Sequence, residues 1–108
     1  MHLTPAAVWE AQRASGWYRP EAFEAEGFIH CTDGEDALLV PANAYHRSDP
    51  RSFVVLEIDV DRLSAPVRYD DAAWRYPHIY GPLNVDAVVG ERRADRDPDG
   101  TFVAFPAR

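Results

Sequence analysis

The sequence lacks the features that form disulfides, cross a membrane or direct secretion. Its single cysteine, Cys31, cannot form a disulfide within the 108-residue chain. No apolar run approaches the roughly 20 residues that a transmembrane helix needs, and the chain opens with no secretory leader pattern. These absences argue against disulfide-rich secreted proteins and membrane-spanning proteins, and we expect a bacterial protein of the cytoplasm.

Basic residues are also scarce, with 11 Lys and Arg against 18 Asp and Glu and a formal net charge of −7. A surface with this charge repels the backbone of a nucleic-acid duplex and offers no basic stripe to an anionic membrane. A local basic spot can still hold a small anionic ligand. The charge therefore restricts the class of partner more than the class of ligand.

The sequence contains no internal repeat, low-complexity stretch or Gly/Ser linker, and its length leaves room for one core. Hydrophobic residues make up 46% and aromatic residues 12% of the chain, a composition that argues against disorder. We therefore expect a single domain over residues 1–108.

Two main helices are expected in the first half. Thr4-Pro5 reads as an N-cap followed by proline at the first helical position, and Ser15-Gly16 reads as a helix stop. Thr32 and Glu35 fit a capping box before a second helix, which is interrupted or kinked at Pro41. Residues 17–26 are expected to form an ordered loop between them.

Strands are expected mostly in the second half. The predicted strands are Met1–Leu3, Gly27–Cys31, Ser52–Val60, Val67–Tyr69, Ala87–Arg92 and Thr101–Phe105. The run over residues 52–60 begins almost wholly apolar, as a strand covered on both faces should. The last two strands are predicted to pair across a turn at Asp97–Gly100. Helices early and strands late indicate an α+β fold.

His30 is the first candidate for chemistry. It ends a predicted strand just before a helix whose free N–H groups can hold an anion, and Thr32 adds a hydroxyl. A histidine there can donate to a phosphate, a ribose hydroxyl or a carboxylate. The alternative is a half-buried structural histidine bonded to a backbone carbonyl.

His78 is the second candidate, inside the segment Tyr76–Leu83. Two prolines and Gly81 fix an irregular backbone there and present the Tyr80 hydroxyl beside an imidazole, as walls of small-molecule sites often do. The alternative is a loop whose tyrosines seal the edge of the core.

The other candidates are weaker. His2 reads as a frayed terminal residue, and His46 reads as a favourable cation at a helix C-terminus. No HxH, HExxH or CxxC spacing occurs, so no metal is expected. Cys31 alternates away from His30 on a strand and reads as a buried apolar group. Glu57 is the one carboxylate that we single out, because burial on the central strand would raise its pKa. No dinucleotide or phosphate-binding glycine motif is present.

Four stretches occur in an order and at spacings typical of one family. They are His2-Leu3-Thr4 with Trp9 in the first helix, Gly27–Thr32, Phe53–Asp59 and Pro77–Asn84. Through them the chain resembles the domain of unknown function 952 over essentially its whole length.

That family is similar in fold to the ADP-ribosyltransferase superfamily, a mostly antiparallel split β-core with flanking helices around an NAD cleft. It most resembles the branch of the tRNA 2′-phosphotransferases, which use paired histidines. The resemblance implies NAD as a cofactor, His30 and His78 as catalytic candidates, and a binding set of His2, Thr4, His30, Thr32, Tyr80 and Gly81. Many transferases carry a further glutamate that this sequence lacks, and Arg75 is the nearest candidate for the branch's basic residues.

Three hypotheses follow. The chain binds a nucleotide or another small anionic ligand with little or no catalysis, or it is a transferase- or phosphotransferase-like enzyme acting on NAD, or it is a structural domain without a ligand. The missing glutamate favours the first over the second, and the clustering of His30 with Thr32 argues against the third. Apolar residues Leu38–Val40 indicate deep burial or a homodimer contact.

Overall fold

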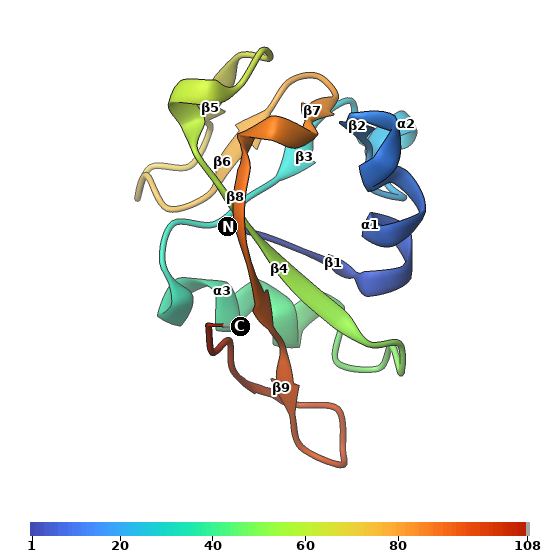
Figure 1. The fold of residues 1–108 in the computed structure, drawn as a ribbon. Coiled ribbons are helices and arrows are strands. Elements are labelled where there is room, and N and C mark those ends of the chain that lie inside the picture. Colours follow the sequence, from blue (N-terminus) through green and yellow to red (C-terminus); the bar gives the residue numbers. More distant parts are fainter. Residues whose placement is uncertain (108) are drawn as a thin grey trace.

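A three-stranded antiparallel sheet forms the centre of the molecule (Figure 1). In the computed structural model, which describes residues 1–107, β4 (Phe53–Ile58) lies between β1 (His2–Pro5) and β8 (Val88–Arg93). The first four residues of β4 are buried, because both of its faces are covered. One face packs against α1 (Ala6–Gln12) and the other against α3 (Glu35–Tyr45). The prediction of a doubly covered central strand is thus confirmed.

A second three-stranded antiparallel sheet lies beside the first, in the order β3 (Ile29–His30), β6 (Pro77–Ile79) and β5 (Val67–Tyr69). Two short ribbons complete the fold: β2 (Trp17–Tyr18) with β7 (Leu83–Asn84), and β9 (Asp95–Arg96) with β10 (Phe102–Ala104). The remaining elements are α2 (Phe23–Glu26) and the 3₁₀ turns η1 (Arg13–Ser15), η2 (Val60–Arg62) and η3 (Val85–Ala87).

The chain is a single α+β domain with antiparallel sheets, as predicted. Its radius of gyration, 13.1 Å, matches the roughly 13 Å of a compact chain of about 100 residues. Within residues 1–107 every helix is too short or too polar to cross a bilayer.

The first helix forms as predicted, but its start differs. Pro5 is the N-cap residue, and Thr4 belongs to β1, where it pairs with Val54. The predicted Thr4 cap is therefore wrong, because Thr4 is part of a strand and its position before the helix is one residue too early to cap it. The chain leaves the helical region at Gly16, whose φ of 87° confirms the predicted stop.

The predicted capping box of the second helix is also wrong. Gly34 is the N-cap of α3, and no side chain caps this helix. The carboxylate of Glu35 instead accepts the amide of Phe105 at 3.0 Å, and the amide of Thr32 donates to the carbonyl of Met1. Pro41 lies inside α3 without ending it, because buried Leu38 and Ala42 hold the helix against the second core cluster.

Two segments predicted as irregular contain strands. Residues 17–26 hold β2 and α2, and the proline-rich segment around His78 holds β6 and β7. The predicted pairing of the last two strands is wrong in part, because β8 pairs with β4 and the two-residue β9 takes its place beside β10. The turn itself is confirmed, with the Gly100 amide donating to Asp97 at 2.9 Å.

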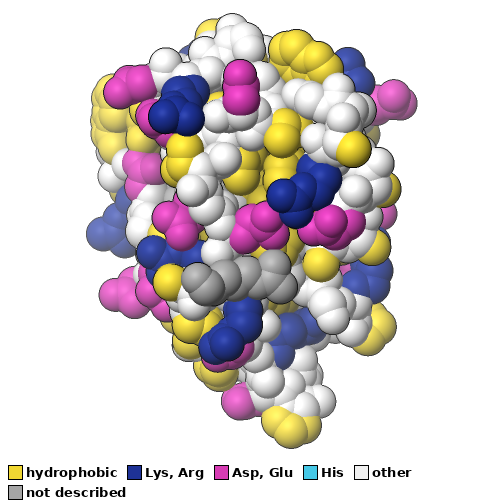
Figure 2. Space-filling view, in the orientation of Figure 1, with side chains coloured by type: hydrophobic (Ala, Val, Ile, Leu, Met, Phe, Trp, Pro, Cys, Tyr) yellow, Lys and Arg dark blue, Asp and Glu magenta, His cyan; other side chains and the backbone are white. Residues whose placement is uncertain are grey.

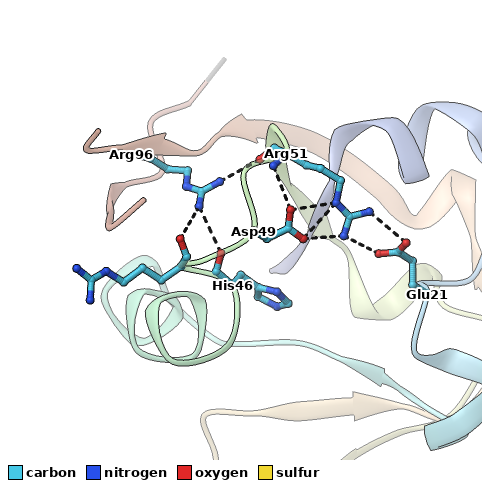
Figure 3. Close-up of polar contacts among 6 residues, drawn as sticks. Glu21, His46, Asp49, Arg51 and Arg96 are labelled. Carbon is cyan, nitrogen blue, oxygen red and sulfur yellow. Dashed lines mark hydrogen bonds and ion pairs between the residues drawn. The ribbon is translucent and has the colours of Figure 1, made fainter. Parts of the chain in front are cut away.

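Arg96 fastens the β9–β10 hairpin to the C-terminal end of α3 (Figure 3). Its guanidinium lies over the rings of Phe53 and Phe102. It donates to the carbonyls of His46 (3.3 Å), Arg47 (3.0 Å), Arg51 (3.0 Å) and Gly100 (3.1 Å). Arg51 in turn bridges Asp49 and Glu21. The carbonyl of His46, the C-cap residue of α3, thus receives a donor from a residue 50 positions away in sequence.

His46 does not serve as the predicted cation at this helix end. Burial is the largest influence on its imidazole and lowers its pKa, so the ring is neutral at pH 7. The guanidinium of Arg96 instead donates to the carbonyls of His46 and Arg47, just past the end of α3.

Replacing Arg96 with Lys should lower the free energy of unfolding by about 1–2 kcal/mol, because an ammonium cannot reproduce the planar fork of donors. Urea denaturation measures the loss. The matched control is Arg62→Lys, since Arg62 is an exposed partner of Asp59 and its replacement should stay within about 0.5 kcal/mol. Equal losses in the two variants would show that the carbonyl contacts contribute nothing.

Candidate functional site

His30 and His78 stand side by side on one face of the second sheet. They are register partners between β3 and β6, and Arg68 on β5 is the register partner of His78 on the other side. Side chains of register partners leave a sheet on the same face, so the three form a row across the strands. The two imidazole centroids are 5.1 Å apart, edge to face.

Strand alternation decides which side chains reach this face. Ile29 and Ile79, the neighbours of the two histidines, are buried in the core on the opposite face. The side chains of His30 and Arg68 remain 58% and 69% exposed, whereas that of His78 is 18% exposed. The row therefore runs along an open surface, with His78 the most enclosed member.

Aromatic rings surround the two imidazoles. Phe28 stacks on His78 with centroids 4.2 Å apart and meets His30 edge to face at 4.8 Å. Tyr80 follows His78 by two positions and so lies on the same face, beside Phe28. The guanidinium of Arg68 lies over the Tyr80 ring, 5.3 Å from its centroid. We call Phe28, His30, Arg68, His78 and Tyr80 the histidine face.

Two carboxylates orient the histidines. Asp70 accepts from the Tyr80 hydroxyl and lies 3.0 Å from Nδ1 of His78 and 3.3 Å from Arg68. The pKa of Asp70 is lowered mainly by the hydrogen bond from Tyr80, and further by the hydrogen bond from His78 and the charge of Arg68. The same bond raises the pKa of Tyr80. Glu26 lies 2.8 Å from Nε2 of His30.

These contacts fix which ring nitrogens are free. A carboxylate with a lowered pKa is ionised and accepts only, so Nδ1 of His78 carries the hydrogen and Nε2 is left unbonded. Nε2 of His30 faces the carboxylate of Glu26 at 2.8 Å, which leaves Nδ1 without a hydrogen-bond partner among residues 1–107. Each imidazole thus keeps one nitrogen for a ligand, in a carboxylate–histidine arrangement that sets its tautomer.

His2 and Thr4 lie elsewhere, in the interior. His2 is 4% exposed, so its interpretation as a frayed terminal residue is wrong. Its Nδ1 lies 2.6 Å from the carbonyl of His30, and its Nε2 lies 2.9 Å from the hydroxyl of Tyr18, which also bonds Thr4 Oγ1. Burial lowers the pKa of His2 to about 4. His2 therefore supports the backbone of His30 from below the histidine face.

The hydrogens in this buried chain can be assigned. The ring of His2 is neutral and holds one hydrogen, which Nδ1 must donate because a carbonyl only accepts. Nε2 then accepts the phenol hydrogen of Tyr18, and the Thr4 hydroxyl supplies the hydrogen of the remaining bond. All three bonds are satisfied without a charge.

Thr32 and Gly81, the other two predicted binding residues, are packed against neighbouring segments. Thr32 is 3% exposed, and α3 begins three residues later with Glu35 and Asp36 in its first turn. Two carboxylates there disfavour an anion, and the anion site at this helix N-terminus stays a prediction. At Gly81 an added Cβ would lie 2.8 Å from the Cβ of Ala65, so glycine permits a close approach of two segments.

Cys31 is buried, as predicted, and burial raises the pKa of its thiol to about 12. Glu57 pairs with Arg92, 2.9 Å away. It borders a groove of about 600 Å³ between α1 and β8. Figure 2 shows hydrophobic side chains between these elements, flanked by arginines and acidic residues. This groove is separate from the histidine face.

Sequence reasoning found both histidines and Tyr80 but missed four members of the site. Phe28 precedes His30 by two positions, and Arg68 is the middle residue of a correctly predicted strand, so alternation alone could have placed both. Asp70 follows β5 and Glu26 ends α2, and no sequence signal connects them with the histidines.

The fold and site define a small α+β protein with an open histidine-aromatic face on an antiparallel sheet. Two crystal structures of the protein CC0527 from Caulobacter crescentus, one of them a double mutant, have this fold with TM-scores of 0.78. They are 28% and 27% identical to this chain, and each alignment covers 94% of this chain and 90% of the other. The solution NMR structure of CC0527 matches with a TM-score of 0.66 and 28% identity over 96% and 87% of the two chains. No curated protein matches.

The particular family is shown by sequence. The chain belongs to the family described as "Protein of unknown function (DUF952)", whose model matches residues 3–91. That range includes the histidine face and both carboxylates, so the whole site lies within the part that the family shares.

Proposed function

We propose that the protein binds a nucleotide of the NAD or ADP-ribose type on the histidine face. The observation that carries the proposal is the row of His30, His78 and Arg68 across three strands, beside two aromatic rings. An adenine or nicotinamide ring would stack on Phe28 or Tyr80, the phosphates would accept from Arg68, and the free imidazole nitrogens would accept from ribose hydroxyls.

The carboxylates complete the match to a nucleotide. Ribose hydroxyls are donors, and Asp70 and Glu26 are acceptors at the two ends of the histidine pair. A purely apolar ligand would leave the two free imidazole nitrogens without partners, and a bare phosphate would leave the aromatic rings unused. The two antiparallel sheets and the family membership support the transferase-like fold that the sequence resemblance implies.

The net charge of the chain favours a small ligand over a polyanion. At −7, the chain repels long polyanions, whereas the phosphates of one small ligand can be met by the single guanidinium of Arg68. The proposal is therefore a small molecule rather than a nucleic-acid duplex.

Titrating ¹⁵N-labelled protein with ADP-ribose, and separately with NAD, should produce saturable amide shifts at residues 26–31, 67–71 and 77–81. Replacing Phe28 with Ala and Arg68 with Gln should each weaken binding roughly tenfold or more, because each removes one class of contact. The matched control is His46→Gln, which alters a histidine on the far side of β4 and should bind as the wild type does.

Absence of shifts at the histidine face at millimolar ligand would overturn the proposal. So would shifts confined to the groove between α1 and β8. Binding that survives both Phe28→Ala and Arg68→Gln unchanged would likewise place the ligand elsewhere.

A further inference from the structure

The two histidines have the arrangement of a proton-transfer pair. Both rings lie on one open face, 5.1 Å apart, and each has one nitrogen held by a carboxylate and one unbonded. A ligand lying over the face can therefore contact both free nitrogens at once. General acid–base catalysis requires such a pair of groups within hydrogen-bond reach of two reacting atoms.

The carboxylates make the two histidines unequal. The carboxylate of Asp70 has three polar partners, Tyr80, Arg68 and His78. Within residues 1–107, the carboxylate of Glu26 has His30 as its hydrogen-bond and ion-pair partner. In the row of side chains His78 lies between His30 and Arg68, and His30 is the more exposed ring. This order suits His78, through Nε2, to take a proton beside the guanidinium, and it suits His30 to give one to a departing group.

The face provides proton carriers and a cation, while its other oxygen groups are engaged with their neighbours. Within residues 1–107 the carboxylates of Glu26 and Asp70 and the hydroxyl of Tyr80 are hydrogen-bonded, and the thiol of Cys31 is buried with a raised pKa. An attacking oxygen that belongs to the substrate or to water needs none of these bonds to break. The guanidinium of Arg68, next in the row, lies where it can offset negative charge on a phosphoryl group.

We propose that His30 and His78 act as general acid and general base in the cleavage of a small ribonucleoside 3′-phosphodiester, an inference that rests on nucleotide binding at the histidine face. Nε2 of His78 takes the hydrogen of the 2′-hydroxyl, and the 2′-oxygen attacks phosphorus. The bond from phosphorus to the 5′-oxygen breaks, and His30 gives that oxygen its proton. The products are a 2′,3′-cyclic phosphate and a free 5′-hydroxyl, with no other reactant consumed.

The test uses the dinucleotide uridylyl-3′,5′-adenosine with the full chain, and its 2′-deoxy analogue as the matched substrate control. The wild type should release the cyclic phosphate and adenosine, with a bell-shaped dependence of kcat/KM on pH. His30→Gln should lower the rate at least about 100-fold and remove the alkaline limb. His78→Gln should lower it similarly and remove the acid limb. The deoxy analogue should stay intact, because it lacks the attacking hydroxyl.

The controls separate this reaction from a contaminant and from simple binding. His46→Gln, purified identically, should cleave at the wild-type rate, and amide spectra should show that all variants are folded. Cleavage that persists in the double variant of His30 and His78, or cleavage of the deoxy analogue, would overturn the inference. ADP-ribose shifts without any dinucleotide cleavage would also overturn it while leaving nucleotide binding intact. Absence of both would overturn both proposals.

Discussion

Acidification from pH 7 to pH 4 should destabilise the fold by about 3 kcal/mol through His2 alone. The ring of His2 is buried as a neutral group, and burial lowers its pKa from 6.5 to about 4. In the unfolded chain the ring takes up a proton near pH 6.5, whereas in the folded protein it does so only near pH 4. Because the unfolded state binds more protons in this window, stability is complete above pH 6.5 and falls as the pH drops toward 4.

The magnitude follows from about 2.5 pKa units at roughly 1.4 kcal/mol each. Other charges move the pKa in the same direction as burial, since the N-terminal ammonium, His30 and His46 all disfavour a second positive charge. The bond to the carbonyl of His30 works the other way but is the smaller influence.

The His2→Asn variant isolates this contribution. An asparagine amide can still donate to the carbonyl of His30, but it does not titrate. Urea denaturation of both proteins at pH 7, 5.5 and 4 gives two curves of stability against pH. The wild-type curve should fall more steeply by about 3 kcal/mol over the window. Parallel curves would contradict the burial of a neutral His2.

The second large effect concerns the turn between β9 and β10. Replacing Gly100 with Ala should lower the free energy of unfolding by about 3 kcal/mol or more, from two sources. Its φ is +94°, a conformation that costs an alanine about 1 kcal/mol or more. The added Cβ would also lie 2.2 Å from the carbonyl oxygen of Arg47, so the hairpin must move away from α3.

Gly16 offers a matched control for the first source. Its φ is 87° and its ψ is −7°, a left-handed conformation, and nothing lies within 4 Å of an added Cβ. Gly16→Ala should therefore cost only the conformational strain, about 1 kcal/mol. Urea denaturation of both variants separates strain from contact. Equal losses would mean that the hairpin does not rest on the end of α3, and that the contacts of Arg96 in Figure 3 are not needed to hold it there.

Local patterns were sufficient to predict several elements of this protein. The apolar run at Phe53–Ile58, the helix from Ala6, the stop at Gly16 and the turn at Asp97–Gly100 are all present, because each depends on residues adjacent in sequence. Alternation along β3 likewise placed His30 outward and Cys31 inward. The sequence by itself therefore determined the α+β class and identified both members of the histidine pair as candidates, but not that they are neighbours.

Tertiary structure decided the rest. Only the register of β3 with β6 brings His30 to His78, 48 positions apart, and only the loop after β5 brings Asp70 to both His78 and Tyr80. His2 is buried because β1 pairs with β4 and Tyr18 closes over it. In each case the deciding contact joins residues distant in sequence, and its free energy depends on burial and partners that no local pattern of residues contains.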